Sequence, residues 1–277
     1  KSKTLCVDFS TGVAKLETAV NEAETLLTSE KATNKALDAM LTKLQTALDK
    51  YVAGLMVTKN EHTSKLKNPN FTTMQTSGWL GSTPGLEHNV GEFFNTTFDM
   101  YQNLTGLEPG KYLIYMQGFY RNGSHDTAYP KHQNSTEQLL ARLYAGSTST
   151  PIRSVYDQTF SQGSWNNYLD NRAQAETAFN TSAKTLANYH IATVTSTGKL
   201  RIGIKKTSAV ALDWTCFNNF RIFFVPQEDN TDIENVLSTK HKTQRNEVYD
   251  LMGRKCTESS ALPKGIYIKN GKKIIIK

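Results

Sequence analysis

The chain has 277 residues, of which 38% are hydrophobic and 10% aromatic, a composition typical of a globular protein larger than one average domain. No stretch approaches the ~20 apolar residues that a membrane-spanning helix needs, so no integral membrane segment is expected. The net charge is +7.

This positive charge is confined to one end of the chain. From Lys240 onward there are ten Lys or Arg and three acids, so residues 1–239 carry no net charge. A basic surface running across the fold, the usual mark of nucleic-acid binding, is therefore not predicted. We do not expect nucleic acid as a partner.

Residues 11–58 have helical periodicity in two segments. Apolar residues recur every three or four positions, at 13, 16, 20, 23 and 27 and again from 37 to 55. Residues 1–64 are therefore predicted to form an antiparallel helical hairpin, with oligomerisation through a coiled coil as the alternative. The candidate helix caps are Asp8 or Ser10 for the first helix and Ser29 or Thr33 for the second.

From Asn68 the pattern changes to short segments separated by turns. Residues 198–206 alternate apolar and charged side chains, which predicts a half-buried strand, whereas residues 105–121 and 211–225 are apolar on both faces. Such strands without periodic helices between them predict an antiparallel β-sandwich over residues 65–226.

One segment of this region does not follow the strand pattern. Residues 122–190 are rich in Asn, Ser, Thr, Gln and Tyr, with a possible short strand at 138–145. A loop of that length in a compact domain is usually functional or carries small elements of its own.

The C-terminal part begins with a polar linker, residues 227–246, followed by a small β module at 247–277. Asn270-Gly271 is a strong signal for a two-residue hairpin turn, because both positions of that turn need positive φ. The hairpin would pair Ile266 with Ile275, Tyr267 with Ile274, and Ile268 with Lys273.

The module contains residues that match a known C-terminal pattern, namely Tyr249, Asp250, Leu251, Gly253, Arg254, Gly265, Ile266, Tyr267 and Lys277. Through these residues it resembles the C-terminal sorting segment of secreted Bacteroidetes proteins, the kind associated with type IX secretion. The segment is shorter than the usual Ig-like sorting domain. The resemblance implies that the protein is secreted or held at the cell surface, with the secretion machinery as a partner.

Two strands in the middle of the chain contain a second recognisable set of residues, Gly110, Tyr112, Phe119, Tyr120, Arg121, Trp214, Phe217, Asn219 and Phe220. Through them this part resembles galactose-binding-like β-sandwiches, a jelly-roll fold found in carbohydrate-binding modules and in uncharacterised surface proteins of the same bacteria. Asn218 stands where an Asp is common. The resemblance implies the fold more strongly than sugar binding, because function lies in the loops.

No motif of nucleophilic, metal-dependent or nucleotide-binding catalysis is present, and the six histidines show no metal-binding spacing. Cys6, Cys216 and Cys256 are far apart and are expected to be unpaired, mostly buried thiols. Glycoside hydrolysis would need two facing carboxylates. The acids available in or near the loops are Asp126, Asp157, Asp170 and Asp213, and their scatter favours a protein that is not an enzyme.

Sugar recognition without catalysis needs an aromatic face and planar amide, acid or Arg groups. The segments 121–129 and 164–172 contain both, although packing in the core or within loops is the alternative for each residue. Trp79 and Trp214 are assigned to the core. The candidate ligand-binding residues are Tyr120, Arg121, His125, Asp126, Tyr129, Trp165, Asn166, Asn167, Tyr168 and Asp170.

Sandwiches of the type that the chain resembles often hold a structural calcium ion between the opening loop and the last strand. Calcium prefers oxygen ligands. The candidates here are Asn68, Asn70, Asp213 and Asn219, and no other cofactor is expected.

The sequence therefore favours a non-catalytic extracellular or cell-surface protein that binds a glycan or a glycoprotein. A surface scaffold that docks a protein partner without binding sugar is the first alternative. A glycoside hydrolase is the second.

Overall fold

The computed structural model describes residues 2–29 and 32–226 and, beyond position 247, four short strands. The chain forms two compact units, Lys1–Gln227 and Glu228–Lys277, and each is considered by itself. The predicted linker, residues 227–246, lies outside the described residues.

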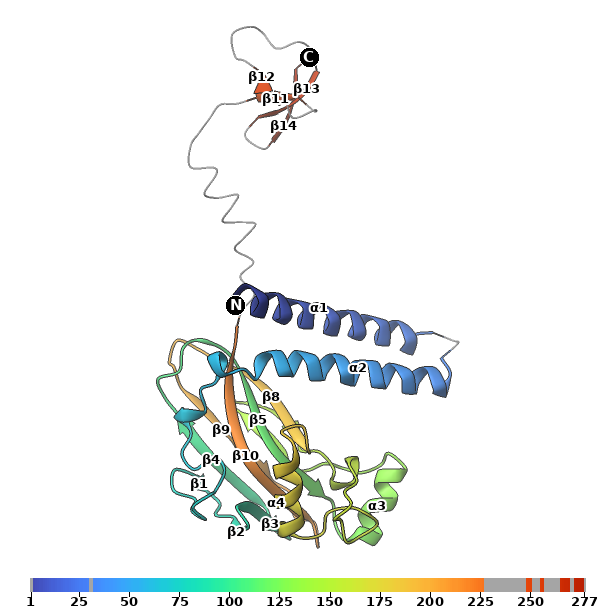
Figure 1. The fold of residues 1–277 in the computed structure, drawn as a ribbon, viewed down its shortest axis with the longest axis vertical. Helices are drawn as coiled ribbons and strands as arrows, with labels where there is room; N and C mark the ends of the chain where they lie inside the picture. Colours follow the sequence, from blue (N-terminus) through green and yellow to red (C-terminus); the bar gives the residue numbers. More distant parts are fainter. Residues whose placement is uncertain are drawn as a thin grey trace. The chain divides into compact units, whose positions relative to one another are not determined.

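The first unit begins with two antiparallel helices, α1 (Ser2–Leu27) and α2 (Asn34–Leu55), which confirm the predicted hairpin (Figure 1). Thr33 caps α2, since its hydroxyl oxygen accepts a hydrogen bond from the Ala36 amide at 3.2 Å. The prediction for the first cap is wrong: α1 begins at Ser2, so Asp8 and Ser10 lie within the helix.

The predicted apolar stripes are only partly buried. Of the predicted positions only Leu55 is buried, and the other buried side chains of the pair are Ala19, Ala47 and Val52, which lie outside the predicted stripes. Beyond the reach of the sandwich, two slender helices cannot cover all of each other's apolar surface. The side chains that stay exposed are Val20, Leu27, Leu37 and Leu41.

Two short 3-10 helices, Thr58–Asn60 and Thr63–Lys65, lead from α2 into two five-stranded antiparallel sheets. Sheet A has the order β2 (Gly85–Glu87), β3 (Val90–Phe94), β10 (Trp214–Val225), β5 (Gly110–Arg121) and β8 (Ala187–Val194). Sheet B has the order β1 (Leu80–Gly81), β4 (Phe98–Leu104), β9 (Leu200–Lys206), β6 (Arg142–Ala145) and β7 (Thr148–Pro151).

The main hydrophobic core contains apolar side chains of both sheets, including Tyr112 and Phe217 of sheet A and Met100 and Ile204 of sheet B. Along β4 and β9, buried side chains largely alternate with more exposed ones, as predicted for residues 198–206. This alternation leaves the outer face of sheet B open to solvent. The two inner faces therefore pack as a β-sandwich.

Sheet A is covered on its outer face as well, which explains why β5 and β10 are apolar on both sides. Val52 and Leu55 of α2 pack on one part of this face, against Leu113 and Phe223. A second cluster on Phe119, Trp214 and Cys216 is covered by the segment between β5 and β8. The helical pair is thus held by the sandwich through the end of α2.

The polar segment 122–190 is not one long loop. Besides β6, β7 and the start of β8 it contains α3 (His125–Gln133), a 3-10 turn (Val155–Asp157) and α4 (Arg172–Thr181). The possible strand at 138–145 exists only as β6, Arg142–Ala145. Sequence reasoning missed both helices because their buried residues are mainly alanines (Ala128, Ala175 and Ala178), which give a weak periodic signal.

A β-bulge interrupts the pairing of β10 with β5. Asn218 lies opposite Gln117 and Arg221 opposite Tyr115, so two residues of β10, Asn219 and Phe220, face one of β5. Asn219 has φ +52°. The bulge frees the Phe220 amide, which donates a hydrogen bond to the Pro69 carbonyl at 2.8 Å and so fixes the chain entering the sandwich.

The second unit is a four-stranded antiparallel sheet with the order β12 (Lys255–Cys256), β11 (Val248–Asp250), β13 (Gly265–Lys269) and β14 (Lys272–Ile276). The predicted hairpin register is confirmed, with Ile266 opposite Ile275, Tyr267 opposite Ile274 and Ile268 opposite Lys273.

Trp79, Trp214 and Cys216 are buried, as the sequence predicted for them. Within the described ranges, no helix combines the length and the apolar character needed to cross a bilayer.

Candidate functional site

Six predicted ligand residues meet where β5 ends and α4 begins. We call this group the loop cluster: Arg121, His125, Tyr129, Trp165, Tyr168 and Asp170. Arg121 is the last residue of β5, His125 starts α3, and Asp170 precedes Asn171, whose side chain caps α4 by accepting a hydrogen bond from the Gln174 amide at 2.9 Å. The fold therefore brings residues 121–129 into contact with residues 165–170, which lie about forty positions further along the chain.

The polar centre of the loop cluster is one carboxylate oxygen. Asp170 Oδ1 accepts a hydrogen bond from Arg121 Nη1 at 2.7 Å and lies 2.7 Å from His125 Nε2. Arg121 Nη1 also lies 2.7 Å from His125 Nε2, so this ring nitrogen contacts both a donor and an acceptor. On the other side of the ring, His125 Nδ1 lies 2.9 Å from the Tyr156 hydroxyl.

The protonation states follow from burial and from these bonds. Burial lowers the pKa of His125 despite the neighbouring Asp170, which keeps the imidazole neutral near pH 7. Burial acts to raise the pKa of Asp170, but hydrogen bonds from His125 and Arg121 outweigh it and lower the pKa. Asp170 is thus an ionised acceptor, which is the wrong state for a general acid.

The aromatic part of the loop cluster is packed but not sealed. His125 stacks on Trp165 with ring centroids 4.2 Å apart and an interplanar angle of 9°, and Tyr129 meets Trp165 edge-on at 5.1 Å. Tyr129, Trp165 and Tyr168 are each half-buried. Part of each side chain therefore remains accessible to solvent.

A tight turn presents two of these rings. Trp165 and Tyr168 flank Asn166 and Asn167, whose φ values of +48° and +64° match a type I′ hairpin turn. The two exposed asparagines form the tip of the turn. Both predicted amides therefore lie beside the rings of the loop cluster.

The remaining predicted ligand residues are placed differently. Tyr120 is fully buried in the main core, where its hydroxyl donates to the Asp213 carboxylate at 3.0 Å. Successive strand residues point to opposite faces, so Tyr120 faces away from Arg121. We therefore leave Tyr120 out of the candidate site. Asp126 is exposed in the first turn of α3.

A cavity of about 230 Å³ opens beside Arg121 and Asp170, and we call it the end cavity. Its floor is a cross-strand row in which Trp214 lies opposite both Phe94 and Arg121. The Phe94 ring is 49% exposed. The full lining is Glu87, Glu92, Phe94, Arg121, Asp170, Asn171, Arg172 and Trp214.

Charges in the end cavity are arranged in pairs. Arg172 binds Glu92 at 3.0 Å and also pairs with Glu87. The Arg121 guanidinium lies 5.2 Å from the centre of the Trp214 ring while it holds Asp170. The cavity therefore offers fixed, planar, hydrogen-bonding groups beside an exposed aromatic ring.

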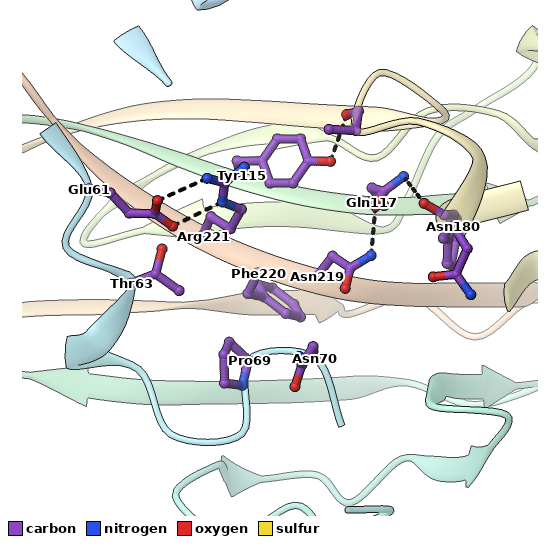
Figure 2. Close-up of a pocket in the computed structure, with 12 residues that line it drawn as sticks. Glu61, Thr63, Pro69, Asn70, Tyr115, Gln117, Asn180, Asn219, Phe220 and Arg221 are labelled. Carbon is purple, nitrogen blue, oxygen red and sulfur yellow. Dashed lines mark hydrogen bonds and ion pairs between the residues drawn. The ribbon is translucent and has the colours of Figure 1, made fainter. Parts of the chain in front are cut away.

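A larger cavity, about 410 Å³, lies over the β-bulge, and we call it the bulge cavity (Figure 2). Glu61 and Arg221 form a two-bond ion pair, at 3.0 and 2.9 Å, at one end of it. The amides of Gln117, Asn180 and Asn219 gather at the other end (Figure 2). Its volume lies within the usual range of ~300 to 1,000 Å³ for ligand pockets.

Sequence reasoning missed the bulge cavity as a site. Two signals were present: Gln117 is a lone polar residue within the apolar strand LIYMQGFY, and Asn218-Asn219 interrupts the aromatic run of β10. Apolar side chains on either side of this polar row, Tyr115 and Phe119, belong to separate clusters under separate covers. The outer face of sheet A is therefore open between the two covers.

Gln117 is the structural anchor of the bulge cavity. Its Nε2 donates to the carbonyls of Phe179, Ser182 and Thr185 at 3.1, 3.0 and 3.0 Å. Its Oε1 accepts from Asn219 Nδ2 at 2.7 Å. Gln117 thereby ties the chain that follows α4 to the sheet.

The four predicted calcium ligands do not come together. Asn70 and Asn219 line the bulge cavity, while Asn68 donates its amide to the Ser77 carbonyl at 2.8 Å. Asp213 is six residues from Asn219 along extended backbone, roughly 20 Å at ~3.3 Å per residue, and is buried with the Lys206 ammonium as its partner. No group of three or more His, Cys, Asp or Glu residues suited to a metal occurs in the described part of the chain.

The chain has few similarities to known proteins. No family model matches the chain, and no curated protein matches it. Among solved structures, one described as TmCBM61 in complex with beta-1,4-galactotriose is similar, with 15% identity over 58% of this chain and 98% of that chain, and a TM-score of 0.32. A TM-score of that size is too low to carry an argument from the likeness.

Proposed function

We propose that this protein binds a glycan, free or on a glycoprotein, without cleaving it, and that the site is the end cavity together with the adjoining loop cluster. One observation carries the proposal. The half-exposed Phe94 ring lies in the same cavity as Arg121, Asp170 and Arg172. An aromatic surface beside fixed planar polar groups is the combination that a pyranose ring needs.

The size of the end cavity favours one sugar ring rather than a chain inside it. The apolar face of the ring would rest on Phe94, and its hydroxyls would bond to Asp170 and the two arginines. Further residues of a glycan would cross toward Trp165 and Tyr168, because Asp170 is shared between the end cavity and the loop cluster.

The state of the carboxylates supports binding rather than hydrolysis. A glycosidase needs one acid with a raised pKa facing a second carboxylate. Asp170 has a lowered pKa, and Glu87 and Glu92 are paired with Arg172. Of the other candidate acids, Asp157 pairs with Arg153 at 3.4 Å and Asp213 with Lys206.

A glycan array followed by calorimetric titration tests the proposal. Phe94→Ala is expected to weaken binding of the selected glycan at least tenfold, and Asp170→Asn to weaken it several-fold. Leu80→Ala removes a similarly exposed apolar side chain from β1 of sheet B and is the matched control. Undiminished binding by Phe94→Ala, or an array without any bound glycan, would contradict the proposal.

We also propose that the sandwich belongs to the galactose-binding-like, jelly-roll class, and that the 247–277 unit delivers the protein to the cell surface or medium. The motif residues in that unit support delivery. Truncation after Gln227 should abolish secretion from a bacterium with type IX export, measured by immunoblot of the medium. Equal secretion of the truncated and full chains would rule this role out.

The second candidate function is a surface scaffold, and it has one observation in its favour. Leu27 and Leu41 of the helical pair are 73% and 68% exposed. Light scattering of the protein with and without the substitutions Leu27→Ser and Leu41→Ser would reveal a complex that depends on these side chains. A glycan-binding protein that stays monomeric in both forms would disfavour the scaffold.

A further inference from the structure

We propose that the bulge cavity is a second binding site, and that it takes an uncharged sugar bearing an acetamido group. The choice of a sugar rests on the proposed function, whereas the cavity and its polar lining do not. Some polar groups of the cavity are already engaged with one another, and others are free to bind a ligand.

The charged end of the bulge cavity is self-neutralised. Arg221 donates through Nε and Nη2 to the two carboxylate oxygens of Glu61. The hydrogen bond from Arg221 outweighs burial and lowers the pKa of Glu61, so the pair stays ionised at neutral pH. An incoming charge would gain little from a pair already satisfied, which favours an uncharged ligand.

The amide end has unused hydrogen-bonding capacity. Gln117 is fully engaged, but Asn219 uses its nitrogen on Gln117 and keeps its oxygen as an acceptor. Asn70 accepts a bond from the Thr72 hydroxyl at 3.2 Å and keeps its two donors. Among the described residues, no hydrogen bond engages the exposed Asn180 amide. The ligand must therefore supply both donors and acceptors.

The bulge cavity provides no ring for stacking. Tyr115, Phe179 and Phe220 line it, but they are only 1%, 3% and 1% exposed. A plain hexose, which relies on contact between an aromatic face and its C–H groups, has no partner of that kind here. An acetamido group places an N–H donor, a carbonyl acceptor and a methyl group in one rigid plane, which amides and a small apolar wall can match.

The geometry that creates this lining is specific and costs conformational energy. Asn219 is held at φ +52°, a conformation unfavourable for most residues, and its backbone N–H donates a hydrogen bond to Asn218 Oδ1 at 2.7 Å. Without the bulge, strand alternation would set the side chain of residue 219 on the inner face. The bulge instead places an amide in the cavity.

The test is a titration of the full chain, followed by nuclear magnetic resonance, with the methyl glycosides of N-acetylglucosamine and N-acetylgalactosamine. The methyl glycosides of glucose and galactose serve as matched sugars that lack the acetamido group. Asn219→Gly keeps the positive φ and removes the amide. Asn180→Ala removes an exposed amide that no hydrogen bond engages among the described residues, and Phe94→Ala disables only the end cavity.

We expect an acetamido sugar to bind at least fivefold more tightly than its parent hexose. Asn219→Gly and Asn180→Ala should each weaken it about three- to tenfold, the range for one hydrogen bond, whereas Phe94→Ala should leave it unchanged. Equal binding of parent hexoses, or insensitivity to both asparagine substitutions, would overturn the second site. Binding lost with Phe94→Ala alone would assign the sugar to the end cavity, which supports the proposed function and rejects this inference.

Discussion

The two cavities on the outer face of sheet A are lined by different kinds of side chain. The end cavity combines paired charges, two arginines with three acids, and a half-exposed ring, Phe94. The bulge cavity combines amides with a single self-neutralised ion pair, and its rings are buried. Ring exposure and charge pairing, rather than cavity volume, therefore set the kind of ligand that each cavity suits.

The two cavities also differ in what maintains their shape. The end cavity is held by ion pairs at the end of β5 and the start of α4. The bulge cavity is held by a buried amide, Gln117, which bonds three carbonyls of the chain that follows α4. Substitutions should therefore affect stability and binding in different proportions at the two places.

The largest effect is expected for Gln117→Leu. The three carbonyls and Asn219 lose their partner in a buried place, and an unsatisfied buried polar group costs about 1–3 kcal/mol. We expect the free energy of unfolding to fall by about 3 kcal/mol or more, measured by urea denaturation. Asn180→Ala in the same cavity is the control and should change it by less than about 0.5 kcal/mol.

A smaller effect is expected for Arg121→Gln, which tests the anchoring of the end cavity. The substitution removes the bonds to Asp170 and to the Gly123 carbonyl, and the contact with the Trp214 ring. We expect a loss of about 1–2 kcal/mol in unfolding free energy and weaker glycan binding.

Arg201→Gln provides a matched control for this substitution. Arg201 also lies over an aromatic ring, Tyr101 at 4.1 Å, but it is exposed on sheet B. Arg201→Gln should lower the free energy of unfolding by less than about 0.5 kcal/mol. If Arg121→Gln and Arg201→Gln lowered the free energy of unfolding equally, the burial of Arg121 would not contribute to stability.

Acid should weaken the loop cluster before it affects the bulge cavity. Because the folded pKa of His125 is lowered, the unfolded chain binds the proton more readily once pH falls below the unfolded value of ~6.5. The contribution of neutral His125 to the free energy of unfolding is therefore fully present above the unfolded pKa. It declines as the pH falls toward the folded pKa.

Asp170 does not contribute to this decline, because its lowered pKa matters only below the ordinary carboxyl range, near ~4. His125→Gln should reduce the pH dependence between 7.5 and 5, measured by urea denaturation at each pH. An unchanged pH profile in the variant would exclude His125 as its source.

The smallest effect is expected for Asn167→Gly in the turn that carries Trp165 and Tyr168. Asn-Gly is the preferred pair for a type I′ turn, and φ of +64° costs glycine nothing. We expect the free energy of unfolding to rise by a few tenths of a kcal/mol, about 0.5 at most, as measured by thermal denaturation. A loss of stability would indicate that the Asn167 side chain has a structural role.

Much of the fold could be predicted from local pattern. The apolar spacing of residues 13–55 gave the helical pair, the alternation in 198–206 gave a half-exposed strand, and Asn270-Gly271 gave the register of the last hairpin. These features depend on residues close together in the chain. The helices α3 and α4 could not be predicted, because they are short and are stabilised by packing on sheet A.

The candidate site could be predicted only in part, for the same reason. Arg121, His125, Trp165 and Asp170 were recognised by residue type, and the structure brings them into contact. Phe94, Glu92 and Arg172 were not recognised, because β3 and α4 reach the end cavity only through the folded sheet. Tyr120 was misplaced because the face toward which a strand residue points depends on the register.

The classes of element, the location of the surplus charge in residues 240–277 and the types of side chain available for a ligand can all be read from the sequence. Local periodicity and turn chemistry carry that information. Which side chains share a cavity depends on the folded chain, because strand pairing, the bulge at Asn219 and the anchor of Gln117 join residues about a hundred positions apart.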